Sequence, residues 1–396
     1  MSGSPAATRL EQPKGAAPSL KDLVLYFLRL GTFGFGGPIA LTGYMQRDLV
    51  ERRRWFSERD YKEGLTLAQL APGPLAAQLA IYLGWARAGV LGATLVGVAF
   101  VAPSLVMVLA LSVAYVSFGG LPWMQGVFYG IGAAVIAIIA QSAIKLTRIT
   151  PGRDKFLWVV FGISALVTAW TESEIFTLFI AAGVVTVLVR EVAASRGWAA
   201  AVFPLPVWIA TALTSHPAAD LLGKIFLYFG QASLVVFGSG LAIVPFLHGG
   251  VVQEFGWLTE RQFLDAIAVS MITPGPVVIT VAFIGYLVAG LPGSLAAALG
   301  MFLPTYLAVV LAAPYYRRFA ENVRVRAFVD GVTAAATGAI AGAAVVLGKR
   351  ALVDLPTVLI ALVALVILRT TKRVPDPLLI ALAGLAGLLL WMPGKH

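Results

Sequence analysis

The chain repeats itself, and this repeat constrains its fold more than any other feature. Residues 35–74 align with residues 237–276 without a gap, at an offset of 202 residues. Each copy carries, in the same order, a glycine-rich turn, an aromatic segment ending in Glu-Arg and a Pro-Gly-Pro turn. They are Phe35-Gly-Gly-Pro38, Trp55-Phe-Ser-Glu-Arg59 and Pro72-Gly-Pro74 in the first copy, and Phe237-Gly-Ser-Gly240, Trp257-Leu-Thr-Glu-Arg261 and Pro274-Gly-Pro276 in the second. This duplication predicts two structurally related halves.

The apolar content decides what kind of fold the two halves build. Hydrophobic residues make up 59% of the chain, charged residues only 12%, and the mean hydropathy is +0.88. Soluble domains are closer to half apolar and a quarter charged. The apolar runs are long enough to cross a hydrocarbon layer of ~30 Å as helices. The sequence therefore predicts an all-α polytopic membrane protein.

Composition also argues against several other classes of protein. The net charge of +10 is better explained by basic cytoplasmic loops than by a nucleic-acid partner. The chain has no Cys, and His216, His248 and His396 are scattered, so we expect no metal and no other cofactor. The segment Gly342–Arg350 fails the phosphate-loop pattern. Without clustered acids, histidines or a metal set, we expect no enzymatic activity.

We divide the chain into four parts. Residues 1–21 are polar and rich in Pro and Ala, which predicts a disordered cytoplasmic tail. Residues 22–198 and 222–396 form the two membrane repeats. Residues 199–221 link them and contain the apolar run Ala199–Leu213.

The charged loops predict how the two repeats are oriented. Gln46–Lys62 holds six Lys or Arg residues, whereas its counterpart Gly249–Gln262 holds only Arg261. Since Lys and Arg collect in cytoplasmic loops, this difference predicts that the second repeat is inverted relative to the first.

Glycine and proline predict where helices break. Broken or re-entrant elements are expected at Leu23–Met45, Gly64–Leu83, Ile225–Leu247 and Phe263–Val288. Uninterrupted spans are expected at Val90–Val116, Met124–Ile144, Phe156–Trp170, Ile175–Val189, Leu291–Ala313, Phe328–Leu347, Thr357–Leu368 and Leu378–Trp391. Capping boxes are expected at Ser57–Asp60 and Thr259–Gln262.

Broken helices inside a membrane point to transport. Backbone that leaves helix geometry is tolerated there only where it is buried in protein or lines a wet cavity, and its free N–H groups favour anions. The alternative is that Gly and Pro only let helices pack closely. The breaks from both halves are expected to meet near the membrane midplane around a substrate. The candidate binding residues are Arg29, Gly36, Gly37, Pro38, Gln69, Pro72, Gly73, Pro74, Gln78, Gly238, Ser239, Thr273, Pro274, Gly275 and Pro276.

Four charged residues raise more specific hypotheses. Arg29 is the one fixed charge inside an apolar run, which suggests an anion ligand. The alternative is that Arg29 extends outward to the membrane interface. Glu63, Asp265 and Asp330 are candidates for binding a coupling proton, although acids are also common at helix N-termini for electrostatic reasons.

The ordered motifs resemble the chromate ion transporter family in its long two-domain form. The resemblance rests on Phe27-Leu-Arg-Leu-Gly31, Phe35-Gly-Gly-Pro38, Gln69-Leu-Ala-Pro-Gly-Pro74, Phe237-Gly-Ser-Gly240 and Thr273-Pro-Gly-Pro-Val-Val-Ile-Thr280. It implies a multi-pass protein of the inner (plasma) membrane with a cytoplasmic N-terminus, which exports chromate and confers chromate resistance. It also implies sulfate, a similar tetrahedral dianion, as a competitor.

Three alternatives to chromate export remain open at this point. A transporter of the same fold would carry sulfate or another oxyanion, a channel would conduct small anions, and a membrane scaffold would transport nothing. A proton is a candidate coupling ion, and a homodimer is among the arrangements that the sequence allows.

Overall fold

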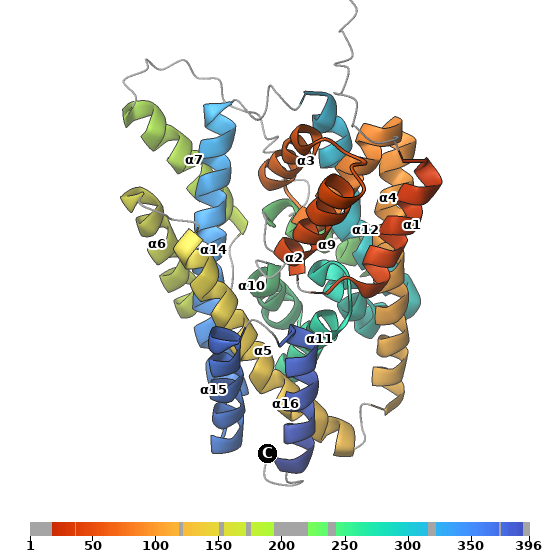
Figure 1. Ribbon diagram of the computed structural model, residues 1–396. Helices are drawn as coiled ribbons and strands as arrows, with labels where there is room; N and C mark the ends of the chain where they lie inside the picture. The colour runs from red at the N-terminus through yellow and green to blue at the C-terminus, as the bar shows by residue number, and fades with distance from the viewer. Residues whose placement is uncertain are drawn as a thin grey trace, which may run out of the picture.

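The computed structural model describes residues 18–35, 37–118, 122–149, 154–171, 176–193, 221–236, 243–315, 322–371 and 374–390. Helices make up nearly all of this part of the chain (Figure 1). Four of them are long and apolar enough to cross a membrane, at Leu75–Phe118, Trp123–Lys145, Val277–Tyr315 and Val323–Lys349. The protein is therefore an all-α polytopic membrane protein, as the composition predicts.

Both halves begin with the same series of broken elements. In the first half these are α1 (Leu20–Phe33), α2 (Gly37–Met45), the π-helix η1 (Gln46–Arg52), α3 (Glu58–Leu70) and α4 (Leu75–Phe118). In the second half they are α9 (Leu221–Val235), α10 (Ile243–His248), the π-helix η3 (Gly249–Glu254), α11 (Glu260–Ile272), the short 3-10 helix η4 (Val277–Ile279) and α12 (Thr280–Ala312), which η5 (Ala313–Tyr315) extends. The described breaks fall at the predicted glycine and proline turns.

A second sharp turn follows each Pro-Gly-Pro break. Helix α4 turns at Ala88–Gly89, where Gly89 has φ +57°, and α12 turns at Ala289–Gly290, where Gly290 has φ +61°. Positive φ is readily accessible only to glycine. The predicted spans at Val90 and Leu291 therefore begin at a real change of direction, and the short helical piece before each turn belongs to the broken element.

Small residues hold these sharp turns closed. In the first half, a Cβ added to Gly84 would lie 2.3 Å from the carbonyl oxygen of Gly92. In the second half, a Cβ added to Gly285 would lie 2.3 Å from the carbonyl oxygen of Gly293. Any larger residue would push the two arms apart, so each sharp turn depends on its glycine pair.

Among the described residues, each half continues with three further helices. They are α5 (Pro122–Ile149), α6 (Lys155–Thr171) and α7 (Phe176–Ala193) in the first half, and α14 (Val323–Ala351), α15 (Leu355–Thr370) and α16 (Asp376–Leu390) in the second. These helices exchange partners between the halves, because α14 packs on α6 and α7 whereas α5 packs on α15 and α16. In Figure 1, α6 and α7 lie in the upper part of the molecule and α15 and α16 in the lower part, as expected for inverted repeats.

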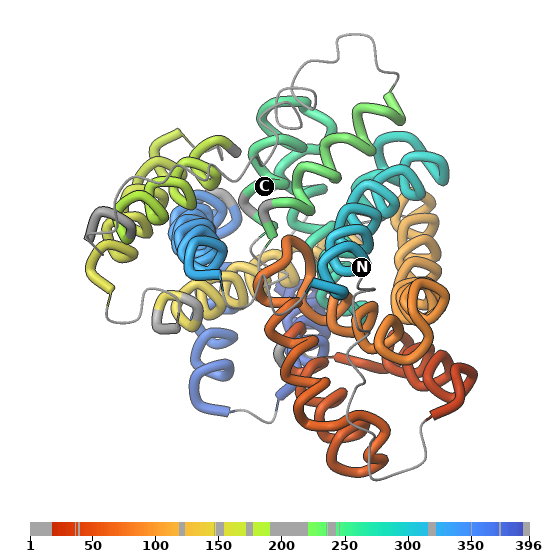
Figure 2. Tube along the Cα trace, turned by 90° about the horizontal axis from the view of Figure 1, so that it is seen from above, coloured from red at the N-terminus to blue at the C-terminus, as the bar shows by residue number. Residues whose placement is uncertain are grey.

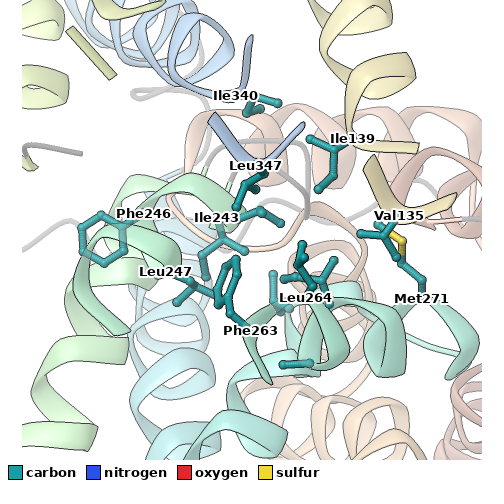
Figure 3. Packing of buried hydrophobic residues seen from close by; sticks show 14 of the residues in the cluster. Val135, Ile139, Ile243, Phe246, Leu247, Phe263, Leu264, Met271, Ile340 and Leu347 are labelled. Carbon is teal, nitrogen blue, oxygen red and sulfur yellow. The ribbon is translucent and has the colours of Figure 1, made fainter. Parts of the chain in front are cut away.

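The two halves also pack against each other through their broken elements. Helix α4 packs against α12, while α1 packs on α4 and α9 packs on α12 (Figure 2). Apolar side chains of α11, such as Phe263 and Met271, belong to one buried cluster with Val135 and Ile139 of α5 and Leu347 of α14 (Figure 3). The second broken element is therefore fixed on a core that both halves supply.

Three local expectations are wrong. Helix α1 begins at Leu20, with Ser19 as its N-cap, so the predicted tail 1–21 ends in helix. The charged segment Gln46–Lys62 is not one loop, because η1 continues α2 through its first part and α3 forms its last part. Ser57 caps α3 by accepting from the N–H of Asp60, without a return bond from the Asp60 side chain, whereas Thr259 and Gln262 form a complete capping box.

Two further expectations fall on residues outside the described part of the chain. These are the disorder of residues 1–17 and the apolar segment Ala199–Leu213.

Candidate functional site at the paired helix breaks

The two Pro-Gly-Pro turns bind the opposite halves of the protein. The N–H of Gly73 donates to the carbonyl of Val236 at 2.6 Å, and the N–H of Gly275 donates to the carbonyl of Gly34 at 2.8 Å. Gly275 is the repeat counterpart of Gly73, and Val236 is the counterpart of Gly34. The two bonds are therefore one interaction made twice. Each turn satisfies a carbonyl just beyond the broken end of α1 or α9 in the other half.

Glycine is required in both turns for conformation and for space. Gly73 has φ +130° and Gly275 has φ +97°, which side-chain-bearing residues rarely adopt. A Cβ on Gly73 would lie 2.5 Å from Oγ1 of Thr305, and a Cβ on Gly275 would lie 2.0 Å from Oγ of Ser104. The close approach of the halves is thus possible only with glycine at these two positions.

Ser104 and Thr305 complete this centre, and the sequence analysis did not single them out. Both are fully buried. Ser104 Oγ lies 2.8 Å from the carbonyl oxygen of Pro274, to which it donates, and Thr305 Oγ1 lies 3.0 Å from Oγ of Ser233. A sequence signal exists, because each hydroxyl residue directly follows the proline shared by the two repeats, Pro103 or Pro304.

Gln78 supports the first turn from inside α4. Its side chain is completely buried, and Nε2 donates to the carbonyls of Ala71 and Pro72 at 3.0 and 2.7 Å. Oε1 of Gln78 is buried without a hydrogen-bond partner among the described residues. In the second half the counterpart is Thr280, whose hydroxyl donates to the carbonyl of Ala266 at 2.9 Å. The same position thus bonds the first turn directly in one half and the preceding helix α11 in the other.

Several other candidate residues lie at or beside the turns. Pro74, Pro274 and Pro276 are buried and Pro72 is partly buried. Thr273 caps the end of α11, and its hydroxyl donates to the carbonyl of Val269 at 2.6 Å. Gly37 and Pro38 begin α2 and are partly buried. Gln69 is exposed in the last turn of α3, apart from this buried group, and Gly36, Gly238 and Ser239 lie outside the described residues.

Arg29 is not brought to the turns. Its side chain is exposed on α1, on the same side of the helix as Leu25, Leu28 and Phe33. The opposite side of α1 packs inward, and a Cβ on Gly31 would lie 2.3 Å from the carbonyl oxygen of Phe100. This placement favours the alternative in which Arg29 extends outward. Backbone groups and helix termini, rather than this guanidinium, are what the centre offers an anion.

Helix N-termini supply positive potential at the centre. Helix α4 begins at Leu75, directly after the first Pro-Gly-Pro turn, and the helical segment of η4 and α12 begins at Val277, directly after the second. The first N–H groups of a helix have no partner within that helix, and together they act as roughly half a positive charge. Two such ends, one from each half, start at the crossed turns, which suits an anion with charge on several oxygens.

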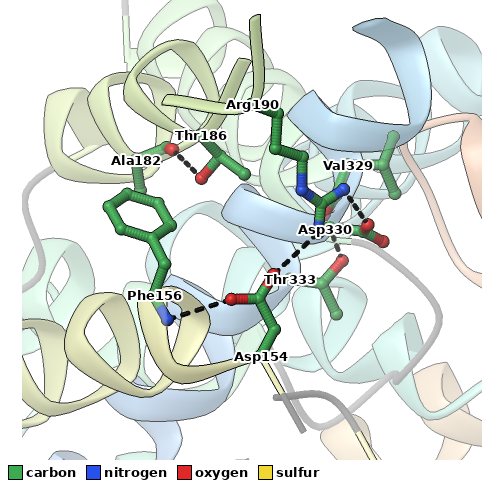
Figure 4. A network of polar contacts seen from close by, with 8 residues as sticks. All are labelled: Asp154, Phe156, Ala182, Thr186, Arg190, Val329, Asp330 and Thr333. Carbon is green, nitrogen blue, oxygen red and sulfur yellow. Dashed lines mark hydrogen bonds and ion pairs between the residues drawn. The ribbon is translucent and has the colours of Figure 1, made fainter. Parts of the chain in front are cut away.

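The three candidate proton-binding acids have different surroundings. Glu63 pairs with Arg59 at 3.2 Å on the surface of α3. Asp330 pairs with Arg190 at 2.7 Å, and Arg190 also binds Asp154 at 3.1 Å (Figure 4). Asp265 is buried and accepts a hydrogen bond from the hydroxyl of Tyr115 at 2.7 Å.

The bridge around Arg190 joins the two halves at one end of the exchanged helices. Partial burial tends to raise the pKa of Asp154, but hydrogen bonds from Arg190 and from the N–H of Phe156 outweigh this, so the pKa is lowered below its ordinary value. At the repeat-related position, Tyr129 donates to Asp354. An ion-paired contact at one end thus corresponds to a hydroxyl–carboxylate contact at the other.

An all-α membrane protein whose two halves meet at paired helix breaks has the architecture of a membrane transporter. Comparison with known proteins identifies which kind. The family model described as chromate transporter matches residues 21–187 and again residues 223–388. The chain belongs to the chromate transporter family, and its two matched parts correspond to its two halves.

Named relatives cover nearly the whole chain. A chromate transport protein of Cupriavidus metallidurans is 58% identical over 380 residues, which cover 94% of each chain. A probable chromate transport protein of Synechococcus elongatus is 55% identical, over 95% of this chain and 96% of its own. A chromate transport protein of Pseudomonas aeruginosa is 30% identical, over 94% and 93%. No solved structure matches the chain.

Proposed function

We propose that this protein exports chromate across the cytoplasmic membrane as a secondary transporter, with its N-terminus on the cytoplasmic side. The observation that carries this proposal is the crossed pair of Pro-Gly-Pro turns, in which Gly73 and Gly275 tie each half to the broken helix of the other. The names of the relatives supply the cargo, and the basic segment Gln46–Lys62 supplies the orientation.

The membrane potential is a sufficient driving force for such export. Moving one charge through 100 mV is worth about 2.3 kcal/mol, so a dianion leaving a negative-inside cell gains about 4.6 kcal/mol. At about 1.4 kcal/mol for each factor of ten, this supports roughly 10³-fold extrusion without a nucleotide. The membrane potential alone therefore supplies enough free energy to export a dianion.

The crossed turns suggest how the site opens. In the described conformation, the N–H groups of Gly73 and Gly275 both bind carbonyls of the opposite half. Opening toward one side would break one of these bonds while its counterpart holds the halves together. The freed N–H, beside the N-terminus of α4 or α12, would then bind an oxygen of the anion. An oxygen of chromate would thus take the place of the carbonyl oxygen of Val236 or Gly34, which accepts this hydrogen bond in the closed site.

The test is chromate flux in inverted vesicles that contain the purified protein, with an imposed potential and with sulfate as competitor. We expect uptake that follows the potential, saturates with chromate and is reduced by sulfate. Sulfate flux without chromate flux would contradict the cargo. Conduction without saturation or counterflow would identify a channel. Vesicles that move neither anion would contradict transport itself.

A further inference from the structure

The three acids singled out by the sequence are not equivalent candidates for binding a proton. Glu63 and Asp330 each pair with an arginine, and their side chains are 21% and 47% exposed. Asp265 is only 4% exposed, and the one hydrogen bond it makes to a described residue comes from Tyr115. A surface carboxylate paired with a guanidinium is held in its charged form, whereas a buried carboxylate without such a partner is costly. Asp265 is therefore the acid for which proton binding relieves the largest penalty.

The charged groups around Asp265 do not neutralise it. The charge of Arg261, one turn earlier on α11, attracts the Asp265 carboxylate without touching it. The Arg261 guanidinium donates its hydrogen bond to the carbonyl of Gln125 at 3.1 Å. Helix α12, which packs on α11, contains no charged residue or histidine. Helices α5 and α16 also pack on α11, and the charge of Lys145 on α5 affects Asp376 on α16. The π-helix η3 packs on α11 as well, and its one charged residue is Glu254, which is exposed. Among the described residues, the hydrogen bond from Tyr115 of α4 and the charge of Arg261 are the interactions that favour the charged form of Asp265.

The position of Asp265 links it to the crossed turns. Helix α11 runs from Asp265 directly into Thr273 and the second Pro-Gly-Pro turn. The carbonyl of the next residue, Ala266, accepts a hydrogen bond from the hydroxyl of Thr280, which is the first residue of α12. Tyr115 belongs to α4 of the other half and packs against Phe283 of α12, with ring centroids 5.2 Å apart. The Asp265–Tyr115 contact therefore joins the halves on the helix that carries the turn.

We infer that Asp265 is the proton-binding site of this transporter, with Tyr115 as its positioning residue. The inference rests on the proposed function and adds the coupling ion to it. In each cycle Asp265 takes up one proton from the side opposite to the chromate, by forming an O–H bond, and releases it on the other side. Protonation turns a charge-assisted hydrogen bond into a neutral one of about half the strength, which loosens the contact between the halves.

The experiment measures chromate flux and proton movement together in liposomes that contain the purified protein and a trapped pH-sensitive dye. In the wild type, an imposed chromate gradient should drive protons in the opposite direction. In Asp265→Asn, proton movement per chromate should fall at least tenfold, while exchange of labelled for unlabelled chromate continues. Glu63→Gln is the matched control, because it neutralises the repeat counterpart, and it should retain the wild-type ratio.

Two further variants keep the test decisive if Asp265→Asn loses all flux. Asp265→Glu, which restores a carboxyl, should recover proton movement. Tyr115→Phe should move the pH midpoint of transport upward, because it removes a hydrogen bond that favours the carboxylate. Proton movement at the wild-type ratio in Asp265→Asn, or chromate flux without proton movement in the wild type, would overturn the assignment. Absence of chromate flux in the wild type would instead overturn the proposed function.

Discussion

The two Pro-Gly-Pro turns share a backbone and differ in the side chains around it. Gly73 and Gly275 make equivalent hydrogen bonds to the opposite half, at 2.6 and 2.8 Å. The first turn is supported by the amide of Gln78, whereas at the equivalent position the second half has the hydroxyl of Thr280. The acid on the helix before the turn is ion-paired in the first half, at Glu63, and buried in the second, at Asp265.

This difference shows what each half contributes. The geometry that joins the halves tolerates no change, since it depends on glycine at the same place in both. The side chains around it differ, with the amide of Gln78 and the ion-paired Glu63 in the first half and the hydroxyl of Thr280 and the buried Asp265 in the second. The shared backbone therefore joins the halves, and the differing side chains are where the two halves would play different parts in transport.

The largest expected effect tests the shared backbone. Gly73→Ala and Gly275→Ala should each reduce chromate flux more than tenfold and lower the free energy of unfolding by about 1–3 kcal/mol or more, because alanine is strained at these φ values. Flux and thermal unfolding in detergent would be measured for both. Gly43→Ala is the control, since a Cβ there meets nothing within 4 Å. Loss in only one of the two variants would show that the turns are not equivalent.

The next largest effect compares the stability that Gln78 and Thr280 contribute at equivalent positions of the two halves. Gln78→Ala should lower the free energy of unfolding by about 2–6 kcal/mol, because the carbonyls of Ala71 and Pro72 lose their donor at roughly 1–3 kcal/mol each. Thr280→Val removes one donor and should cost about 1 kcal/mol. Gln69→Ala, at an exposed position, is the control for the first. Equal unfolding midpoints for Gln78→Ala and Thr280→Val would contradict the assigned roles.

A similar comparison applies to the buried hydroxyls. Ser104 bonds the carbonyl of Pro274 across the halves, whereas Thr305 bonds Ser233 within the second half. Ser104→Ala should cost about 1 kcal/mol of stability, and it should reduce flux more than Thr305→Val does. Flux normalised to the amount of protein in the vesicles would show this. A larger loss of flux in Thr305→Val would show that the contact of Thr305 with Gly73, rather than the hydrogen bond of Ser104, is the critical contact between the halves.

A smaller effect is expected at the exchanged helices. Arg190→Gln should lower the free energy of unfolding by about 0.5–1 kcal/mol, because the ion pairs with Asp154 and Asp330 are partly exposed. The lowered pKa of Asp154 means that this contribution is complete above the ordinary value of 3.8 and is lost as the pH falls through the lower folded value. Unfolding curves between pH 7 and pH 3 would show it. The wild type should lose its advantage over Arg190→Gln only at the acidic end.

The smallest effect is expected at Arg29. Because the side chain is exposed on α1, Arg29→Gln should leave chromate flux within about twofold of the wild type, as for most surface substitutions. Complete loss of flux with normal membrane insertion would return Arg29 to the anion site.

Much of the fold could be predicted because glycine and proline mark it locally. The breaks at Gly34 and Pro72, and the helices on either side, follow from residues that cannot continue a helix. Because the repeats align at a constant offset, the breaks of the first half predict the equivalent breaks in the second. The opposite charge bias of Gln46–Lys62 and Gly249–Gln262 predicts that the second repeat is inverted, which the labelling experiment below tests.

The long-range partners could not be predicted from the same signals. Nothing local shows that the N–H of Gly73 meets Val236, or that α5 packs on α15 and α16 rather than on α6. Ser104 was overlooked because a single hydroxyl in an apolar helix is common. The exposure of Arg29 could not be predicted either, because the rule that intramembrane charge faces inward does not say which side of α1 is inner.

The central claim is that the two halves are inverted around the crossed turns, and labelling tests it most directly. The chain has no Cys, so single cysteines can be placed at the exposed repeat counterparts Arg52 and Glu254 without further changes. With a membrane-impermeant maleimide on intact cells, we expect Glu254→Cys to react and Arg52→Cys to react only after permeabilisation. Reaction of both cysteines from the same side would show that the halves are parallel and would contradict the account.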